Sequence, residues 1–420
     1  MSVALFTAVS GLGNFQTMLD VVSNNISNVN TTGYKSSRTS FQEMLSTTSL
    51  PASKPNDVRG GRNPIQLGLG ATVASIDRVF TQGAIEQTGS STDLAITGDG
   101  FFVVDTGTTR AYTRNGHFSV DSAGYLVDKA GLYVQGWPAE NGTVNTDAGL
   151  SRLNIPLGSQ MIAKATENVV MAGNLDGGQA IFSAGPPPTG GQYTTEVTVY
   201  DSLGEEYRVP ITFTRVAAAG TAAASWDWSA DFGGGNVGTG TVSFTGSGGL
   251  DTANSTALPA LTISPTNGAL PLNVNLDMSS MSQFVTDGES SVLPESQDGF
   301  SAGTLLSFDI GQTGLITGRF TNGQLRDLGQ IGMAFFANPM GLQHTEGGMF
   351  IESGNSGVAQ VGPPGTGPRG SLTAGALEMS NVDLTAEFSK MIMAQRAFQA
   401  NSRVITTMDE ILTEVNNLKR

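Results

Sequence analysis

The stretch LFTAVSGLGNFQTMLDVVSNNISNV, residues 5–29, repeats apolar residues at intervals of seven. Two positions of the repeat, three residues apart, are apolar, and they hold Leu5, Leu12, Leu19 and Ile26, and Ala8, Phe15, Val22 and Val29. This spacing places the apolar side chains in one narrow stripe along a helix. We therefore predict a helix over residues 3–29 that packs against another helix.

The far end of the chain carries the same pattern in the stretch LTAEFSKMIMAQRAFQANSRVITTMDEIL, residues 384–412. A helix with so narrow an apolar stripe is marginal alone in water, so we expect the two ends to pair or to bind neighbouring molecules. This pattern favours assembly over catalysis. The residues predicted to mediate self-assembly are Leu5, Leu12, Phe15, Leu19, Val22 and Ile26 in the first helix, and Leu384, Met391, Phe398, Ile405, Met408 and Leu412 in the second.

The composition narrows the class of protein. The 420 residues suffice for two or three domains with their own cores, and 55 glycines with only 14% charged residues suit short strands joined by tight turns. A net charge of −15 argues against nucleic-acid binding, which needs clustered Lys and Arg. The absence of cysteine excludes disulfides and thiolate chemistry.

Targeting signals are also missing from the sequence. No apolar stretch reaches the length of a membrane span, and no Lys or Arg precedes Lys35. We therefore expect neither membrane insertion nor a cleaved signal peptide.

Changes of pattern along the chain predict a nested organisation, mainly β with α-helical coiled-coil termini. The two terminal helices, at 1–33 and 376–420, are expected to enclose a β domain at 71–152 and 286–375, which follows an extended connector at 34–70. This β domain in turn is expected to enclose an inserted acidic outer β domain at 153–285.

Turn signals refine the β regions. Asn115-Gly116 lies between two β-prone arms, which predicts a hairpin turn. Residues 201–204, Asp-Ser-Leu-Gly, are predicted to connect strands near 195–200 and 209–213.

The start of the final helix has its own signal. Ser380 with Asp383 three residues later resembles a capping box. Glu387 and Lys390 are spaced to pair on the outer face of this helix.

Catalytic and cofactor motifs are weak. The glycine run at 233–238 is followed by a β-prone stretch, whereas a dinucleotide site needs a helix there. His117 and His344 stand outside any catalytic or zinc-binding motif. Sequence alone leaves open that the fold brings two carboxylates together, but we predict no enzyme, no cofactor and no metal site.

Several segments resemble the bacterial flagellar rod and hook protein family. The N-terminal signature SNNISNVNTTGYK lies at 23–35, and the terminal signature LEMSNVDL at 377–384. Further matching segments are QGAIEQTG at 82–89, DLAITGDGFF at 93–102, YTRNG at 112–116, VQGW at 134–137, VYDSLG at 199–204 and FIESGNSG at 350–357.

The resemblance implies a structural subunit of the flagellum. Because rod proteins have little between their ends, the middle domain favours a hook-type subunit that self-assembles into a curved helical tube. Such a tube acts as a universal joint and transmits torque from rod to filament. The partners implied are further copies of the chain, a hook cap protein, a distal rod protein, a hook–filament junction protein and the flagellar type III export apparatus. The location implied is the basal body and hook, outside the cell.

Two other interpretations remain open at this point. One is a distal rod protein of the basal body, and the other, from a different class, is a secreted β-rich adhesin or enzyme. The second would explain the middle of the chain but not the matching stripes at its ends.

Overall fold

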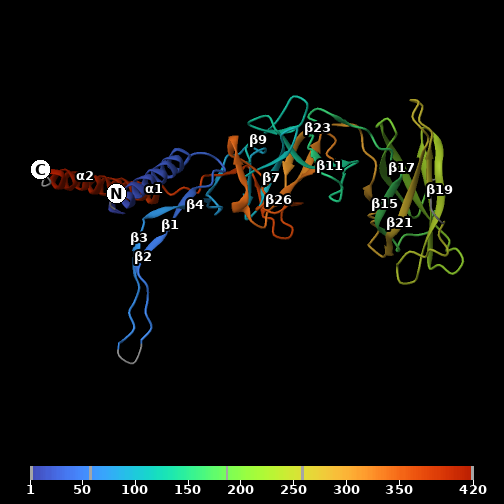
Figure 1. Ribbon diagram of the computed structural model, residues 1–420. Helices are drawn as coiled ribbons and strands as arrows, with labels where there is room; N and C mark the ends of the chain where they lie inside the picture. The colour runs from blue at the N-terminus through green and yellow to red at the C-terminus, as the bar shows by residue number, and fades with distance from the viewer. Residues whose placement is uncertain (1–2, 56–58, 186–187, 257–259, 418–420) are drawn as a thin grey trace. The chain divides into compact units, whose positions relative to one another are not determined.

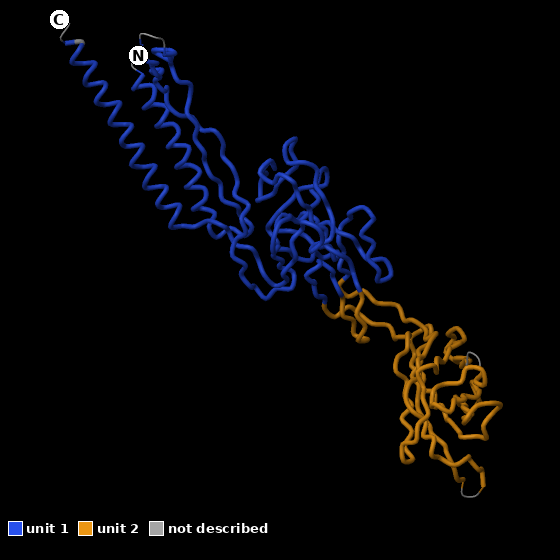
Figure 2. Tube along the Cα trace, turned by 90° about the horizontal axis from the view of Figure 1, so that it is seen from below, with its two compact units in different colours: residues 1–156, 308–317, 327–420 blue, residues 157–307, 318–326 orange. Residues whose placement is uncertain are grey.

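The computed structural model describes residues 3–55, 59–185, 188–256 and 260–417. The chain forms two compact units (Figure 2). Unit 1 comprises Met1–Pro156, Phe308–Thr317 and Asp327–Arg420, and unit 2 comprises Leu157–Ser307 and Gly318–Arg326. The predicted fold class, mainly β with terminal helices, is confirmed.

Two α-helices, α1 (Val3–Ser27) and α2 (Leu384–Asn417), lie side by side in unit 1, with the N- and C-terminal ends near each other (Figures 1 and 2). They are antiparallel, since Asn25 contacts Glu387 near one end and Gly11 faces Asn401 further along. A Cβ atom at Gly11 would lie 2.7 Å from the Asn401 side-chain nitrogen, so a larger residue there would displace the Asn401 side chain. No helix in the described part of the chain is long and apolar enough to cross a membrane.

The start of α2 differs from the predicted capping box. The Asp383 carboxylate accepts hydrogen bonds from the backbone N–H groups of Thr385 and Ala386, at 2.9 and 3.2 Å. Ser380 instead accepts from the N–H of Val382. Asp383 is therefore the N-cap residue, because its carboxylate satisfies donors that the first helical turn leaves free.

Residues 34–70 are more ordered than the expected connector. Strand β1 (Ser37–Glu43) pairs antiparallel with β4 (Ala71–Arg78), and β2 (Ser46–Leu50) pairs with β3 (Ile65–Gly68). We call residues 37–78 the arm. Figure 1 shows β2 and β3 extending away from both helices. Strands β1 and β2 were missed because they show no regular alternation of apolar and polar residues, and most side chains of the arm are exposed.

The β domain of unit 1 is built on the strand order β25-β11-β7-β8-β28-β27. Its core packs Phe101, Phe336 and Phe350 around Tyr112. The elements of this domain are β5 (Ile85–Gln87), β6 (Leu94–Thr97), β7 (Phe101–Asp105), β8 (Arg110–Thr113), β9 (Phe118–Val120), β10 (Leu126–Asp128), β11 (Tyr133–Glu140), β12 (Thr143–Val144), β13 (Ser151–Arg152), β25 (Leu325–Ile331), β26 (Met333–Phe335), η1 (Pro339–Gly341), β27 (Gln343–Thr345), η2 (Glu346–Gly348), β28 (Met349–Ile351), β29 (Gln360–Gly362), β30 (Ser371–Ala374) and β31 (Ala376–Glu378).

The hairpin predicted at Asn115-Gly116 is wrong. Strand β8 pairs with β7 and β28, and β9 pairs with β10 across the turn at 121–124. A Cβ atom at Gly116 would lie 1.7 Å from the carbonyl oxygen of Leu94. Glycine is needed here for a close approach of two backbones, and not for a hairpin turn.

Unit 2 contains a sandwich of two four-stranded sheets, ordered β16-β17-β18-β19 and β20-β21-β15-β22. Trp226 and Trp228 are fully buried in its core. The strands of unit 2 are β14 (Gln160–Met161), which pairs with β23 (Gly303–Ile310) outside the sandwich, and β15 (Asn168–Asp176), β16 (Gln192–Tyr200), β17 (Glu206–Val216), β18 (Ala224–Phe232), β19 (Gly235–Phe244), β20 (Ala260–Ile263), β21 (Leu272–Phe284) and β22 (Leu293–Gln297). Strands β23 and β24 (Leu315–Phe320) cross the boundary between the two units.

One turn prediction for this sandwich is confirmed, and the glycine run at 233–238 is only partly a turn, because β19 begins at Gly235. Residues 201–204 connect β16 to β17. Gly233 and Gly234, both with positive φ, turn the chain from β18 into β19, so no helix follows the glycine run.

Candidate self-assembly site

The predicted stripe residues divide between the helix–helix contact and solvent. Ala8 and Val22 of the repeat are buried, as is Ala394 on α2, and Phe15 also contacts Phe41 of the arm. Most of the other stripe residues are half-buried, namely Leu5, Leu12, Leu19, Ile26, Met391, Ile405 and Met408. Leu384, Phe398 and Leu412 are exposed. Packing of α1 on α2 therefore covers much of the stripe within one chain.

A second apolar surface on the helices remains uncovered. We call it the open face. It consists of side chains that lie outside the predicted stripe and are exposed: Val3, Phe6 and Val9 on α1, and Phe388, Ile392, Met393, Val404 and Ile411 on α2. Sequence reasoning missed this surface, although Phe388 and Ile392 are four residues apart, as neighbours on one helix face are.

The arm adds further exposed apolar side chains. Leu45 is 83% exposed, and Leu50, Ile65 and Leu67 on β2 and β3 are exposed as well. A two-stranded hairpin is marginally stable in water on its own. Both the arm and the open face thus have apolar surface available for contacts with other molecules.

A buried ionic cluster lies where the chain passes between the helices and the β domain. Lys35 Nζ is 2.6 Å from Glu378 Oε1, and Arg114 Nη1 is 3.3 Å from Glu378 Oε2. The backbone N–H of Gly83 donates to Glu378 Oε1 at 2.9 Å, and Lys35 Nζ donates to the carbonyl of Thr81 at 2.8 Å. One carboxylate thus links the segment after α1, the segment before α2 and two parts of the β domain.

Burial dominates the electrostatics of this cluster. It lowers the pKa values of Lys35 and Arg114, and Glu378 only partly opposes that effect in each case. The side chains of Lys35, Arg114 and Glu378 are at most 2% exposed. Two cations therefore share one buried carboxylate, and loss of that carboxylate would leave only the electrostatic attraction of Asp99 to oppose their burial.

Two asparagines extend the cluster into a polar joint. Asn25 donates to the Ser37 carbonyl at 2.8 Å and to Glu387 Oε2 at 3.1 Å, and accepts from the Ser37 N–H at 2.9 Å. Asn381 accepts from the N–H of Ser36 and donates to the carbonyl of Val79, both at 2.8 Å. We use the term polar joint for Asn25, Lys35, Arg114, Glu378, Asn381 and Glu387.

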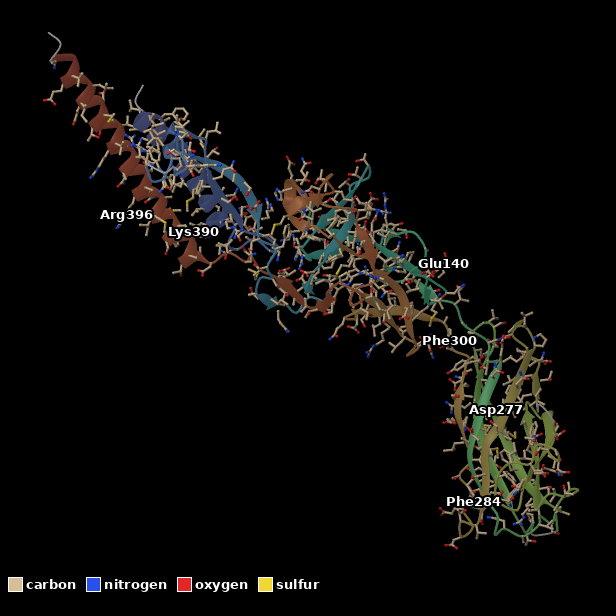
Figure 3. The ribbon with its side chains drawn as sticks, turned by 60° about the horizontal axis from the view of Figure 1, so that its bottom comes forward. Glu140, Asp277, Phe284, Phe300, Lys390 and Arg396 are labelled. Carbon is tan, nitrogen blue, oxygen red and sulfur yellow. The ribbon has the colours of Figure 1, made fainter. Side chains whose placement is uncertain are left out.

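One prediction about this region is corrected. Glu387 does pair with Lys390, whose Nζ lies 2.7 Å from Glu387 Oε1, but Glu387 is buried and faces Asn25 instead of lying on the outer face. Figure 3 labels Lys390 on α2, with Arg396 further along the helix. No signal in the sequence marks this contact, because Asn25 and Glu387 are 362 residues apart.

The histidines and acidic residues make local contacts. His117 Nδ1 lies 2.8 Å from Asp93 Oδ1, and the ring of His344 packs edge-on against Phe350. In the part of the chain that the structure describes, no group of three His, Asp or Glu side chains is arranged to hold a metal ion.

Family models of known proteins match most of this chain. Four family models match it: "Flagella basal body rod protein" at 5–35, "Flagellar hook protein FlgE/F/G D1 domain" at 95–170, "Flagellar basal body protein FlaE D2 domain" at 174–300, and "Flagellar basal body rod FlgEFG protein C-terminal" at 373–418.

Full-length relatives agree with these matches. The chain is 38% identical to the flagellar hook protein FlgE of Borreliella burgdorferi, with 99% of each chain covered. It is 35% identical to FlgE of Escherichia coli, over 99% of this chain and all of that protein. It is 30% identical to the flagellar basal-body rod protein FlgG of Bacillus subtilis, again over 99% of both.

A solved structure supports the same fold. The crystal structure of Helicobacter pylori flagellar hook protein FlgE2 matches with a TM-score of 0.52 at 16% identity, covering 70% of this chain and 99% of that one. Paired terminal helices that enclose nested β domains thus define a flagellar axial subunit. The chain belongs to the flagellar hook protein family.

Proposed function

We propose that this chain is the structural subunit of a flagellar hook, which self-assembles into a curved helical tube and transmits torque from rod to filament as a universal joint. The observation that carries the proposal is the open face of the helix pair, together with the exposed apolar residues of the arm. Apolar surface of this extent is costly in water and is stabilised when neighbouring subunits cover it.

The predicted stripe and the open face have different roles in this proposal. The half-buried stripe residues hold α1 against α2, so that each subunit presents a defined pair of helices. Leu384, Phe398 and Leu412, together with Ile392 and Val404 of the open face, contact neighbouring subunits.

The polar joint suits torque transmission. A buried cluster with several directed hydrogen bonds has one favourable geometry, because any shift leaves a charge or a donor without a partner. The joint therefore couples rotation of the helix pair to the β domain of the same subunit.

The partners and the route out of the cell are also part of the proposal. The family context suggests binding to a hook cap protein, a distal rod protein and a hook–filament junction protein. It also suggests export through the flagellar type III apparatus without a cleaved signal peptide.

A distal rod protein is the second candidate. It is favoured by the match to a rod protein at 30% identity, but the hook relatives reach 38%. The sandwich of unit 2 corresponds to the family region described as the D2 domain.

Electron microscopy separates these candidates. Purified chain at rising concentration is expected to form hollow tubes, and a strain lacking the gene is expected to keep its rods while losing hooks, filaments and motility. Loss of the rod itself would favour the distal rod protein. Both candidates would be contradicted if the purified protein stayed monomeric at every concentration and the strain lacking the gene swam normally.

A further inference from the structure

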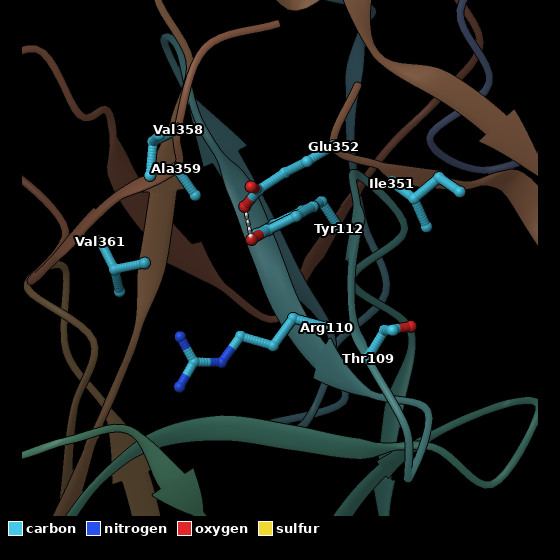
Figure 4. A pocket seen from close by; sticks show the side chains of 8 residues that line it. All are labelled: Thr109, Arg110, Tyr112, Ile351, Glu352, Val358, Ala359 and Val361. Atoms are coloured by element: carbon cyan, nitrogen blue, oxygen red, sulfur yellow. Dashed lines mark hydrogen bonds between the residues drawn. The ribbon is translucent and has the colours of Figure 1, made fainter. Parts of the chain in front are cut away.

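A groove on the β domain of unit 1 has no role in the site described above. It has a volume of about 540 Å³ and is lined by Thr109, Arg110, Tyr112, Ile351, Glu352, Val358, Ala359 and Val361 (Figure 4). One wall is apolar, and Val358 is 81% exposed on it. We call this the β8–β28 groove.

Two charged side chains line the groove, and they differ in their partners. Glu352 accepts a hydrogen bond from the buried Tyr112 hydroxyl, drawn as a dashed line in Figure 4. Burial, followed by this hydrogen bond, raises the pKa of Tyr112. Arg110 is exposed and extends into the groove, and its guanidinium has no hydrogen bond or ion pair with any residue that the structure describes. An occupant with apolar side chains beside a carboxylate would match the wall and the free guanidinium.

The turn between β21 and β22, residues 284–289, has that chemistry. Phe284 and Val285 are 57% and 71% exposed. Asp287 and Glu289 follow, both exposed and, among the described residues, without an ionic or hydrogen-bonding partner for their carboxylates. Figure 3 labels Phe284 on β21, with Asp277 further along the strand.

The turn is also held in a fixed shape. Asn174 Oδ1 accepts from the N–H of Phe284, and Asp176 Oδ1 accepts from the N–H of Thr286 at 2.8 Å. A preformed loop loses less conformational entropy on binding than a mobile one. By contrast, exposed Leu203 lies beside Glu205 and Glu206, whose carboxylates already bond to Asn267 and Arg208.

We propose that the 284–289 turn of one subunit docks in the β8–β28 groove of a second copy of this chain, with Phe284 or Val285 against the apolar wall and Asp287 or Glu289 paired with Arg110. The inference rests on the proposed self-assembly. It assigns the outer β domain a direct contact with the β domain of another subunit.

Charge reversal in two separate variants tests the contact. The groove variant carries Arg110→Glu, and the turn variant carries Asp287→Lys with Glu289→Lys. Each alone places like charges across the contact, and we expect the concentration needed for tube formation to rise about tenfold or more. A 1:1 mixture restores opposite charges wherever the two variants meet, so we expect tubes that contain both in equal amounts.

Matched variants control for charge alone. Lys129→Glu changes an exposed cation of the same β domain outside the groove, and Asp231→Lys with Glu295→Lys changes two carboxylates of unit 2 outside the turn. Both are expected to assemble as the unaltered protein does. The groove variant and the turn variant, each alone, are expected to recover in 1 M salt, where the screening length is about 3 Å.

The outcomes separate this inference from the proposed function. If the unaltered protein forms no tubes, the proposed function fails. If the unaltered protein assembles but the groove and turn variants do so equally well, or the controls are equally impaired, the docking inference is overturned. Rescue when all three substitutions are combined in one polypeptide, without rescue in the mixture, would make the contact intramolecular and would also overturn it.

Discussion

The outer sandwich and the helix pair bury their apolar side chains to very different extents. In the sandwich, Trp226, Trp228, Phe213 and Phe244 are all at most 1% exposed. On the helices, Phe6 and Ile392 are more than half exposed. The sandwich therefore has a closed core of its own, whereas the helix pair is held by the stripe and the polar joint and leaves an apolar surface exposed.

This difference indicates how one chain can be both soluble and ready to polymerise. The closed sandwich and the negative net charge favour a dispersed monomer. The open face and the arm provide the apolar contacts that assembly needs. If the comparison is correct, substitutions in the joint, the stripe, the open face and the sandwich must have separable effects.

The largest effect is expected in the polar joint. Glu378→Gln removes the carboxylate that bonds to both Lys35 and Arg114, and should destabilise the β domain of unit 1 by about 3–5 kcal/mol. The sandwich should be unaffected. Urea unfolding followed by hydrogen exchange would show loss of protection in β6–β8 but not in β16–β19. Glu346→Gln, at an exposed position, is the control, and an equal effect of both variants would contradict the assigned role of the joint.

A pair of adjacent residues on α2 separates the stripe from the open face. Met391→Asp puts a charge into the half-buried contact with α1 and should weaken the helix pair by about 2–3 kcal/mol in the monomer. Ile392→Asp changes a residue that is 52% exposed and should leave the monomer's circular dichroism and melting unchanged while preventing tube formation.

Sedimentation of assembled tubes and thermal melting of dilute monomer measure the two effects separately. Normal tubes from Ile392→Asp would remove the open face from the assembly contacts. Unchanged melting of Met391→Asp would mean that α1 and α2 are not paired in the free subunit.

The helices and the nested β regions could be predicted from the sequence because their signals are local. The seven-residue repeat fixes both helices within a few residues, and residues 201–204 connect two strands as their composition predicts. The Asn115-Gly116 prediction failed because a dipeptide typical of turns also fits where two backbones approach closely, and only the position of Leu94 distinguishes these cases.

The polar joint could not be predicted because its pairing is spatial. Lys35 and Glu378 are 343 residues apart, and Arg114 lies between them in the chain. Both Lys35 and Glu378 fall within segments that resemble the family, which was the available signal. The open face was missed because a seven-residue repeat draws attention to one stripe, whereas a helix that contacts several neighbours needs apolar residues on more than one face.

A smaller effect concerns the pH dependence of the sandwich. Hydrogen bonds from the N–H groups of Gly178 and Thr286 lower the pKa of Asp176. Burial alone would raise the pKa of Asp201, but hydrogen bonds from Asn267 and from the backbone of Glu205 and Leu203 outweigh it and lower the value.

A carboxyl group with a lowered pKa stabilises the fold fully above its unfolded pKa, near 4, and this stabilisation is lost as the pH falls through the folded value. The sandwich should therefore melt at progressively lower temperature below about pH 4. Near-UV dichroism of the buried tryptophans reports the transition. Asp201→Asn should flatten the pH dependence, and an unchanged pH profile in that variant would show that Asp201 does not contribute.

The smallest effect is expected at the start of α2. Asp383 satisfies the N–H groups of Thr385 and Ala386 and lies at the positive end of the helix dipole, so Asp383→Ala should weaken the first turn of α2 by about 1 kcal/mol. Ser380→Ala is the matched control, because Ser380 bonds only to Val382, and it should change the helix little. Hydrogen exchange at 384–388 measures both. Because this turn adjoins the joint through Glu387, tubes from Asp383→Ala should form at nearly normal concentration and break under lower shear. Equal exchange rates in the two variants would show that the cap adds no stability, and that the joint alone fixes where α2 begins.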